Sequence, residues 1–205
     1  MDSSITLKLE VLDYWHMGAG QGHGFAADAV LIKDQQGLPC VPGRTVKGLV
    51  RDAVRKWGAL GHAEGLGLDS EAVEAQLFGE EGGRQGALAF TDAQLPEAVR
   101  YHLDQHGALK ENLYRNIYST AIDNDSGVAV SGSLRGQQVA VPATLYGTVS
   151  WLPNTLNAGD DSLLASAWIK ILESALPLLA GIGVKRHRGF GRVIASVGEV
   201  NHVSV

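Results

Sequence analysis

Cysteine is almost absent from this sequence: Cys40 stands alone among 205 residues. A single thiol excludes an internal disulfide framework and a zinc site built from cysteines. Long hydrophobic runs are missing too, since stretches such as ALPLLAGIGV are shorter than the ~20 residues that a membrane-spanning helix needs. The N-terminal MDSSITLKLE lacks the basic start and apolar core of a signal peptide. We therefore expect a soluble cytoplasmic protein with no membrane partner.

Positive charge is also scarce: 22 Asp and Glu outnumber 17 Lys and Arg, for a net charge of -5. An acidic total argues weakly against a nucleic-acid partner, but the total is a poor guide when charges are segregated along the chain. Here they are segregated. The stretch GIGVKRHRGFG, residues 181–191, holds four basic side chains between two Gly-x-Gly pairs.

Hydrophobic periodicity predicts the main elements of the fold. Strand character is found in four stretches: residues 4–13, 86–95, 137–152 and 188–200. An apolar face with helical spacing is found in two: residues 41–60, with Thr45 as the expected N-cap, and residues 160–181. The order is strand, helix, strand, strand, helix, strand. It predicts an α+β, ferredoxin-like (RRM-like) βαββαβ core with an antiparallel sheet.

Three further stretches lie between these elements. Residues 26–34 have the pattern of a short strand, and residues 69–79 that of a shorter helix that ends at Gly79. Residues 97–142 are polar and mixed, which is typical of a long excursion from the core.

The basic stretch at residues 181–191 has the chemistry of a phosphate-binding loop. Glycine permits positive φ angles and a close approach of another backbone. Successive exposed N–H groups form an anion-binding concavity, and arginine binds phosphate with two parallel hydrogen bonds. A tight turn between helix and strand, with solvated charges, is the alternative that these residues leave open.

Five stretches, in this order, resemble motifs of the RAMP superfamily of CRISPR-associated proteins, which are ferredoxin-like and bind RNA. They are HMGAGQG (16–22), GLPCVPGRTVKGLVR (37–51), LFGEEGGRQGALAFTDA (77–93), residues 120–149, and GIGVKRHRGFG (181–191). The resemblance implies a single RAMP domain over residues 1–205, with a thumb-like insertion at about 112–142 and a glycine-rich loop at 181–191.

Within the superfamily, PGRTVKGLVR after DAVLIKD is most similar to the backbone subunit of type III (Csm/Cmr) effectors. That resemblance implies that Asp28 is a catalytic residue for cleavage of target RNA. A lone carboxylate is a weak base at its usual pKa of ~3.9, so holding Mg²⁺ near the scissile phosphate is at least as plausible a role. A solvated loop aspartate is the alternative.

The resemblance also implies a set of residues that bind RNA. They are His16, Arg44, Lys47, Arg51, Arg135, Gly181, Gly183, Lys185, Arg186, His187, Arg188, Gly189 and Gly191. Lys47 and Arg51 lie one helical turn apart and are expected to contact the backbone of the guide RNA. Arg44 replaces the serine that is usual in the family, so it either adds a contact or blocks one. For His16, a structural role stays open.

The function that this resemblance implies is that of a guide-RNA-binding backbone subunit in antiviral CRISPR defence. Copies would assemble in a helical filament along the crRNA, with other effector subunits, and would cleave bound target RNA at regular intervals in the presence of Mg²⁺. Two alternatives stay open. One is a non-catalytic capping RAMP subunit, and the other is a stand-alone endoribonuclease that processes guide RNA.

Overall fold

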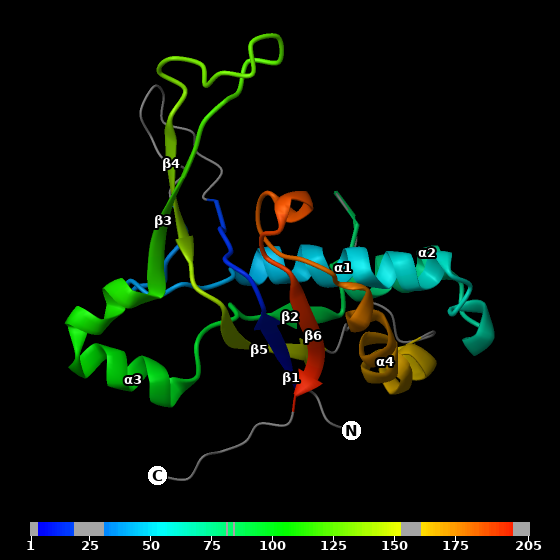
Figure 1. Cartoon of the computed structure of the whole chain (residues 1–205). Coiled ribbons are helices and arrows are strands. Elements are labelled where there is room, and N and C mark those ends of the chain that lie inside the picture. The colour runs from blue at the N-terminus through cyan, green and yellow to red at the C-terminus, as the bar shows by residue number, and fades with distance from the viewer. Residues whose placement is uncertain (1–3, 19–30, 81, 84, 153–160, 199–205) are drawn as a thin grey trace.

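The computed structural model describes residues 4–18, 31–80, 82–83, 85–152 and 161–198. Its centre is a four-stranded antiparallel sheet of β1 (Ser4–Val11), β2 (Leu88–Phe90), β5 (Ala143–Trp151) and β6 (Val193–Gly198). The strands lie in the order β2-β5-β1-β6 (Figure 1). Helix α1 (Gly43–Ala59) connects β1 to β2, and α4 (Asp161–Ala175) connects β5 to β6. This topology confirms the predicted ferredoxin-like βαββαβ core.

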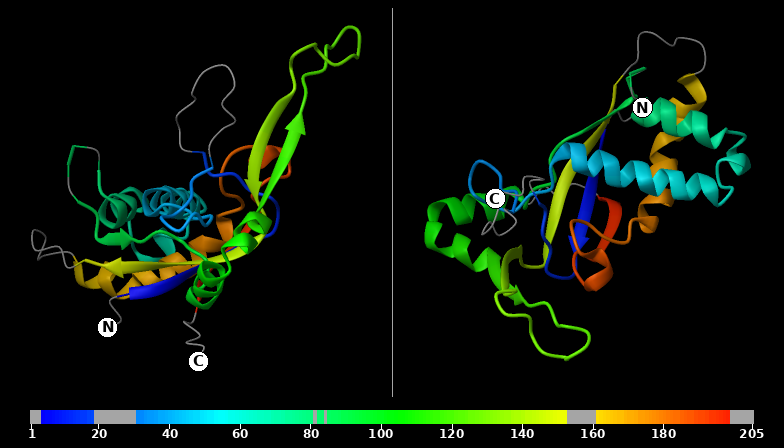
Figure 2. Two further views of the ribbon diagram at one scale, coloured as in Figure 1. Left: turned by 90° about the vertical axis from the view of Figure 1, so that its left-hand side faces the viewer. Right: turned by 90° about the horizontal axis from the view of Figure 1, so that it is seen from above.

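The core lies between the sheet and the two long helices. On β1, Leu7, Leu9 and Val11 are buried, while Lys8 and Glu10 lie on the other face and form an ion pair of 3.2 Å. Helix α1 runs across the strands and buries the side chains of Val46, Val50, Ala53, Val54 and Trp57 (Figure 2, right). The alternating pattern of β1 and the helical pattern of α1 therefore meet as their sequences predicted.

Helix α1 begins in a way that the sequence did not reveal. Its N-cap is Pro42, and no side chain of the cap accepts a hydrogen bond, so the prediction of Thr45 as N-cap is wrong. The amide of Gly43 instead donates to Oδ1 of Asp92, at 2.7 Å, from the chain that follows β2. A Cβ at Gly43 would lie 2.5 Å from the carbonyl oxygen of Phe90. The close packing of α1 on β2 thus requires glycine here.

The shorter helix is α2 (Ser70–Phe78), which ends before Gly79 as predicted. Asp69 caps it by accepting a hydrogen bond from the amide of Ala72, at 2.8 Å. Residues 31–34 do not form the expected short strand: Leu31 and Lys33 each make a single bridge, to Gly18 and Pro39. The first part of that prediction, residues 26–30, lies outside the described residues.

The excursion at residues 97–142 contains a helix and a hairpin. Helix α3 (Glu97–Gln105) comes first, and a 3₁₀ segment at Gly107–Leu113 leads into the hairpin of β3 (Tyr114–Ser119) and β4 (Arg135–Ala140). The hairpin stands away from the rest of the chain (Figures 1 and 2). It lies within residues 112–142, where the thumb-like insertion was predicted.

The stretch at residues 137–152, expected as one strand, is divided at Val141-Pro142. Its first part is β4 of the hairpin, and its second part is β5 of the main sheet. Proline has no amide hydrogen to donate within a strand ladder, so it marks the place where the chain leaves one sheet for the other. Among the described residues, no helix is both long and apolar enough to cross a membrane.

Candidate nucleic-acid interface

The glycine-rich loop presents its basic residues to solvent. Arg186–Arg188 form one 3₁₀ turn, flanked by two residues with left-handed backbone, Lys185 (φ 58°) and Gly189 (φ 79°). All four basic side chains of the turn are exposed: Lys185, Arg186, His187 and Arg188. Lys185 donates to Oε1 of Gln137, at 2.5 Å, on strand β4 of the hairpin. The loop is thereby joined to the base of the hairpin.

Two glycines of the loop face the protein's own backbone and not a ligand. Gly183 (φ 73°) lies so close to the carbonyl oxygen of His16 that a Cβ would overlap it. Gly191 (φ 65°) is buried, and a Cβ there would overlap the carbonyl oxygen of Ile182. In this conformation the close approach that requires glycine is therefore made within the loop and to His16, and a contact of these two glycines with RNA stays a prediction.

The other two glycines differ. Gly189 has open space around the Cβ position, so only its positive φ favours glycine. Gly181 has the side chain of Arg186 and the carbonyl oxygen of Gly191 at 3.3 Å from its Cβ position. Gly189 is exposed next to the basic turn, whereas Gly181 lies at the closed end of the loop.

His16 is fully buried, so the prediction of a direct RNA contact is wrong in this conformation. Its ring nitrogen Nδ1 lies 2.7 Å from the carbonyl oxygen of Gln138 on β4. A carbonyl can only accept, so Nδ1 carries the hydrogen. Nε2 is buried and has no hydrogen-bond partner among the described residues. The structural alternative considered for His16 is the one that the geometry supports.

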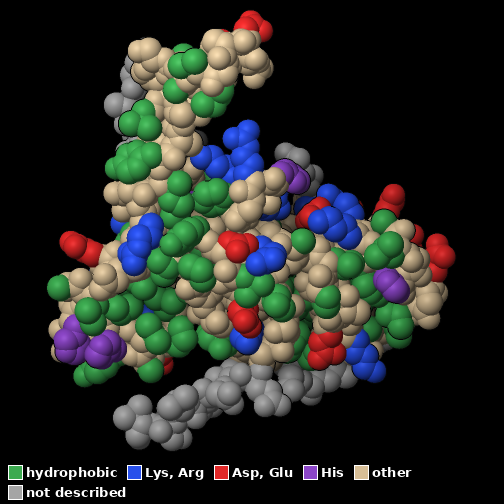
Figure 3. Space-filling model, viewed as in Figure 1, with side chains coloured by type: hydrophobic (Ala, Val, Ile, Leu, Met, Phe, Trp, Pro, Cys, Tyr) green, Lys and Arg blue, Asp and Glu red, His purple; other side chains and the backbone are tan. Residues whose placement is uncertain are grey.

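The base of the hairpin, the loop and the segment after β1 form one junction. Trp15 and Ala140 exchange two backbone hydrogen bonds, of 3.1 and 2.8 Å, and the indole of Trp15 donates to the carbonyl of Val141. In the space-filling view, Lys and Arg side chains gather on the upper surface beside the hairpin, where Figure 1 places the loop (Figure 3).

Two basic side chains of α1 are paired with one carboxylate. Arg51 and Arg55 both donate to the Glu74 carboxylate of α2, each with a shortest distance of 2.6 Å. The hydrogen bond from Arg55, assisted by Arg51, holds the pKa of Glu74 below its usual range. Arg51 is thus not the free cation that the motif predicted. Arg44 is exposed and Lys47 half-buried, and neither has a hydrogen-bond or ion-pair partner among the described residues.

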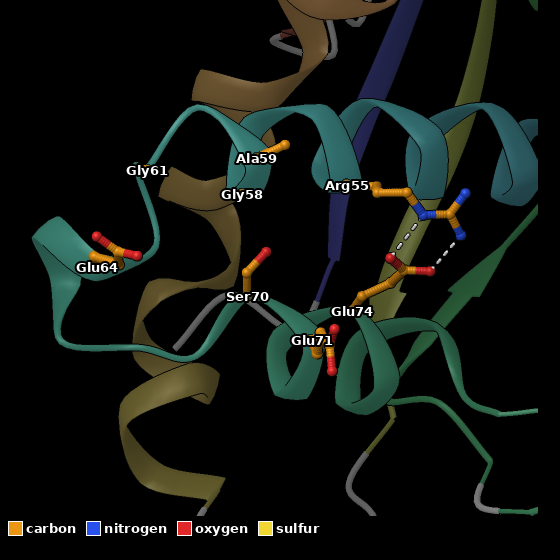
Figure 4. A pocket seen from close by; sticks show the side chains of 8 residues that line it. All are labelled: Arg55, Gly58, Ala59, Gly61, Glu64, Ser70, Glu71 and Glu74. Atoms are coloured by element: carbon orange, nitrogen blue, oxygen red, sulfur yellow. Dashed lines mark hydrogen bonds and ion pairs between the residues drawn. The ribbon is translucent and has the colours of Figure 1, made fainter.

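A hollow between α1 and α2 adjoins this cluster (Figure 4). Its charged lining consists of Arg55 and three carboxylates, those of Glu64, Glu71 and Glu74. The carboxylates repel an anion, and the one guanidinium is already paired. This hollow does not suit a phosphate.

Two residues extend the basic surface around the loop. Arg135 is exposed at the start of β4 and shares a strand face with Gln137, the partner of Lys185, because alternate residues of a strand point the same way. Arg192 was not predicted. Its side chain is 69% exposed, pairs with Asp13 and lines a second hollow with Arg186 and Phe190. The pairing of β1 with β6, which brings Val11 opposite Val193, places Asp13 near Arg192; sequence order alone does not show this.

The catalytic prediction, Asp28, lies outside the described residues. Within the part of the chain that is described, no three His, Cys, Asp or Glu side chains form a group that could hold a metal ion.

The comparisons with known proteins agree with this fold. One family model, described as the RAMP superfamily, matches residues 8–194. No curated protein matches the chain. Among solved structures, a chain of "Cryo-EM structure of the Type III-B Cmr-beta bound to cognate target RNA" has a TM-score of 0.65 at 13% identity, over 94% of this chain and 96% of that one.

A chain of the apo-state structure of the same Type III-B Cmr-beta is equally similar, with a TM-score of 0.65 at 13% identity. The match covers 96% of this chain and 98% of that one. At this identity the likeness is one of fold. The family match extends over nearly the whole described chain, from β1 through the hairpin and the glycine-rich loop into β6. The protein belongs to the RAMP superfamily.

Proposed function

We propose that this protein is a guide-RNA-binding backbone subunit of a type III CRISPR effector. The observation that carries the proposal is the basic turn of the glycine-rich loop. Arg186, His187 and Arg188 are exposed, and their side chains have no hydrogen-bond or ion-pair partner among the described residues. Lys185 joins that turn to the hairpin through Gln137. Membership of the RAMP superfamily and likeness to a chain of Cmr-beta bound to target RNA support the same role.

The binding mode is contact with phosphates. The guanidinium groups of Arg186 and Arg188 can bind phosphates with bidentate geometry, and phosphate contacts do not depend on the base sequence. Base pairing between guide and target then supplies the specificity. Arg135 on the hairpin and Arg44 and Lys47 on α1 are further candidates for phosphate contacts.

Assembly is the second part of the proposal. Copies bind head to tail along one guide RNA, together with other effector subunits, because heterologous contacts that do not close generate a helical filament. A capping subunit would be present once in such a particle, whereas a backbone subunit is repeated.

Cleavage of the target is the third part, and Asp28 is its candidate residue. The carboxylate would hold Mg²⁺, which supplies charge relief at the scissile phosphate. This part is supported by the resemblance of DAVLIKD to the family motif alone. Asp28→Ala is expected to leave RNA binding unchanged and to abolish target cleavage by the assembled particle.

Stoichiometry tests the backbone role. The chain is co-expressed with a CRISPR array and the neighbouring effector genes, and the ratio of protein to guide RNA in the purified particle is measured. We expect several copies per guide. One copy per guide would favour the capping subunit, and absence of retained RNA would contradict the proposal. Cleavage of repeat RNA by the isolated chain would favour the processing enzyme.

The loop is tested by a double substitution, Arg186→Ala with Arg188→Ala. Removing two phosphate contacts is expected to lower the salt dependence of binding to single-stranded RNA by about 1.4 in log-log slope, at ~0.7 per contact. Binding is measured by fluorescence anisotropy over a series of salt concentrations. The control is Lys170→Ala, which removes an exposed lysine on α4. Equal slopes for the double variant and the wild type would contradict the proposed interface.

A further inference from the structure

His16 occupies the junction of three segments without reaching the surface. It follows β1, it touches the glycine-rich loop through its backbone, and it touches the hairpin through its ring. We propose that His16 is a positioning residue for RNA binding, which holds the basic turn of the loop against the base of the hairpin. The inference rests on the proposed function for the identity of the ligand.

The loop side of the junction is made by the main chain. The amide of Val184 donates to the carbonyl oxygen of His16, at 3.0 Å. Gly183 packs on the same carbonyl so closely that no side chain fits at its position. These contacts fix the backbone one residue before Lys185, where the chain turns left-handed and the basic turn begins. The position of His16 therefore determines where the turn starts.

The hairpin side is made by the imidazole. Its Nδ1–H donates to the carbonyl oxygen of Gln138, at 2.7 Å. The next residue of β4 toward the tip, Gln137, receives the hydrogen bond of Lys185. A closed circuit of contacts results: His16 to Gln138, along the strand to Gln137, across to Lys185, and back through Val184 to His16. Neither the loop nor the hairpin base can shift alone without breaking one of them.

The chemistry of the ring shows what the position requires. Within the part of the chain that the structure describes, buried Nε2 has no hydrogen-bond partner, which is unfavourable for a polar atom. A leucine would avoid that unpaired acceptor, but it would also remove the donor to Gln138. An asparagine keeps the donor, since its side-chain N–H reaches about as far as Nδ1–H of histidine. The donor to the hairpin is thus the property that distinguishes a positioning role from space filling.

The test compares His16→Leu with His16→Asn in binding to a fluorescent single-stranded RNA, with thermal unfolding measured on the same samples. We expect His16→Leu to bind about tenfold more weakly, because the displaced basic turn would lose about one charge-assisted contact with a phosphate. For the same reason its salt slope would be smaller. His16→Asn is expected to bind within about twofold of the wild type. A merely structural role would change the unfolding temperature but not the salt slope of the folded protein.

A second variant covers the case in which His16→Leu does not fold. Gly183→Ala pushes the loop away from the His16 carbonyl and leaves the imidazole intact. Folded Gly183→Ala protein is expected to lose RNA affinity to a similar extent. Wild-type affinity and slope in folded His16→Leu or Gly183→Ala would overturn the positioning role. If the double arginine variant also binds like the wild type, the proposed function itself is wrong.

Discussion

At the scale of residues, the cations of this protein divide into paired and unpaired ones. The cations that form ion pairs with carboxylates are Lys8, Arg51, Arg55, Lys56, Arg100, Lys110 and Arg192. The exposed arginines of the glycine-rich loop have no such partner among the described residues. A net charge of -5 therefore coexists with a local positive surface, because the acidic side chains neutralise cations elsewhere.

Two positions of the loop require glycine for different reasons, and alanine substitutions at Gly189 and Gly191 distinguish these reasons. Gly191→Ala is expected to lower the free energy of unfolding by about 3 kcal/mol or more, because positive φ and overlap with the Ile182 carbonyl act together. In Gly189→Ala only the positive φ is unfavourable, so the free energy of unfolding is expected to fall by about 1 kcal/mol. Urea unfolding of both variants measures the difference. Equal losses would show that the loop does not hold this conformation in solution.

At the scale of elements, Glu74 links α2 to α1. Its side chain is 16% exposed and accepts from both Arg51 and Arg55. Isolated helices of this length are marginal, so α2 depends on the burial of Val73, Leu77 and Phe78, to which this link adds. The link also competes with any phosphate for Arg51.

The link between the two helices predicts a pH dependence of stability. The pKa of Glu74 is lowered in the folded protein, chiefly by the hydrogen bond from Arg55. Its stabilisation is therefore fully present above the unfolded pKa of ~4.3 and is lost as pH falls through the lower folded pKa. Glu74→Gln is expected to be less stable than the wild type at pH 7, with the difference vanishing in acid. Denaturant unfolding at a series of pH values measures this, with Glu71→Gln as the matched control on α2. A difference that persists unchanged at pH 3 would contradict it.

The hairpin is held on a second side as well. The hydroxyl of Tyr114 on β3 donates to the carbonyl of Gly37, at 2.6 Å, and the ammonium of Lys33 lies 4.0 Å from the centre of the same ring. Lys110 donates to the carbonyl of Gln36. The base of the hairpin is thus fixed against the turn at residues 34–37 and, through His16, against the glycine-rich loop. An element that projects so far from the body keeps a defined direction only when its base is held in this way.

At the scale of the whole molecule, one hydrophobic cluster joins the sheet, the helices and the hairpin base. It includes Leu9 of β1, Trp57 of α1, Trp168 of α4, and Trp15 with Ala140 at the junction. The proposed binding surface is therefore built on the core and not on an independent unit. Unfolding of the body is expected to remove the surface with it.

Cys40 reports on that core. It is 3% exposed, and burial, with the nearby charges of Asp34 and Asp92, raises the pKa of its thiol to about 11. At pH 8 only about a thousandth of such thiols are deprotonated, and the thiolate is the reactive form. We expect alkylation of the native protein to be very slow and to accelerate in parallel with unfolding as urea is added. Mass spectrometry counts the labelled chains. Rapid labelling without urea would show that the region around Cys40 opens on its own.

The fold was predictable because its signals are local. Alternation on β1, the apolar face of α1 and the order of elements each depend on neighbouring residues, and together they specify a βαββαβ core. The errors were non-local. Thr45 has the chemistry of a cap, but Asp92 accepts the hydrogen bond from across the fold, and residues 137–152 have one strand pattern although Pro142 divides them between two sheets.

The residues predicted to bind RNA divide in the same way. Arg186 and Arg188 were correctly expected on an exposed loop, since charge between glycines in a short connection is seldom buried. His16 and Arg51 were misjudged because a motif records residue type and spacing. It does not record that a carbonyl of β4 or a carboxylate of α2 lies within reach.

The sequence by itself thus determined the layers of this protein, the order of its strands along the chain and the place of its basic loop. Hydrophobic periodicity and charge clusters depend only on residues that are close together in the sequence. Only the tertiary structure decided which cations are free and which glycines face the protein's own backbone. It also showed that His16, in a motif expected to bind RNA, is buried and contacts the loop through its carbonyl oxygen. Such roles depend on atoms from segments more than a hundred residues apart, such as His16 and Gln138, and only folding brings them within hydrogen-bond distance.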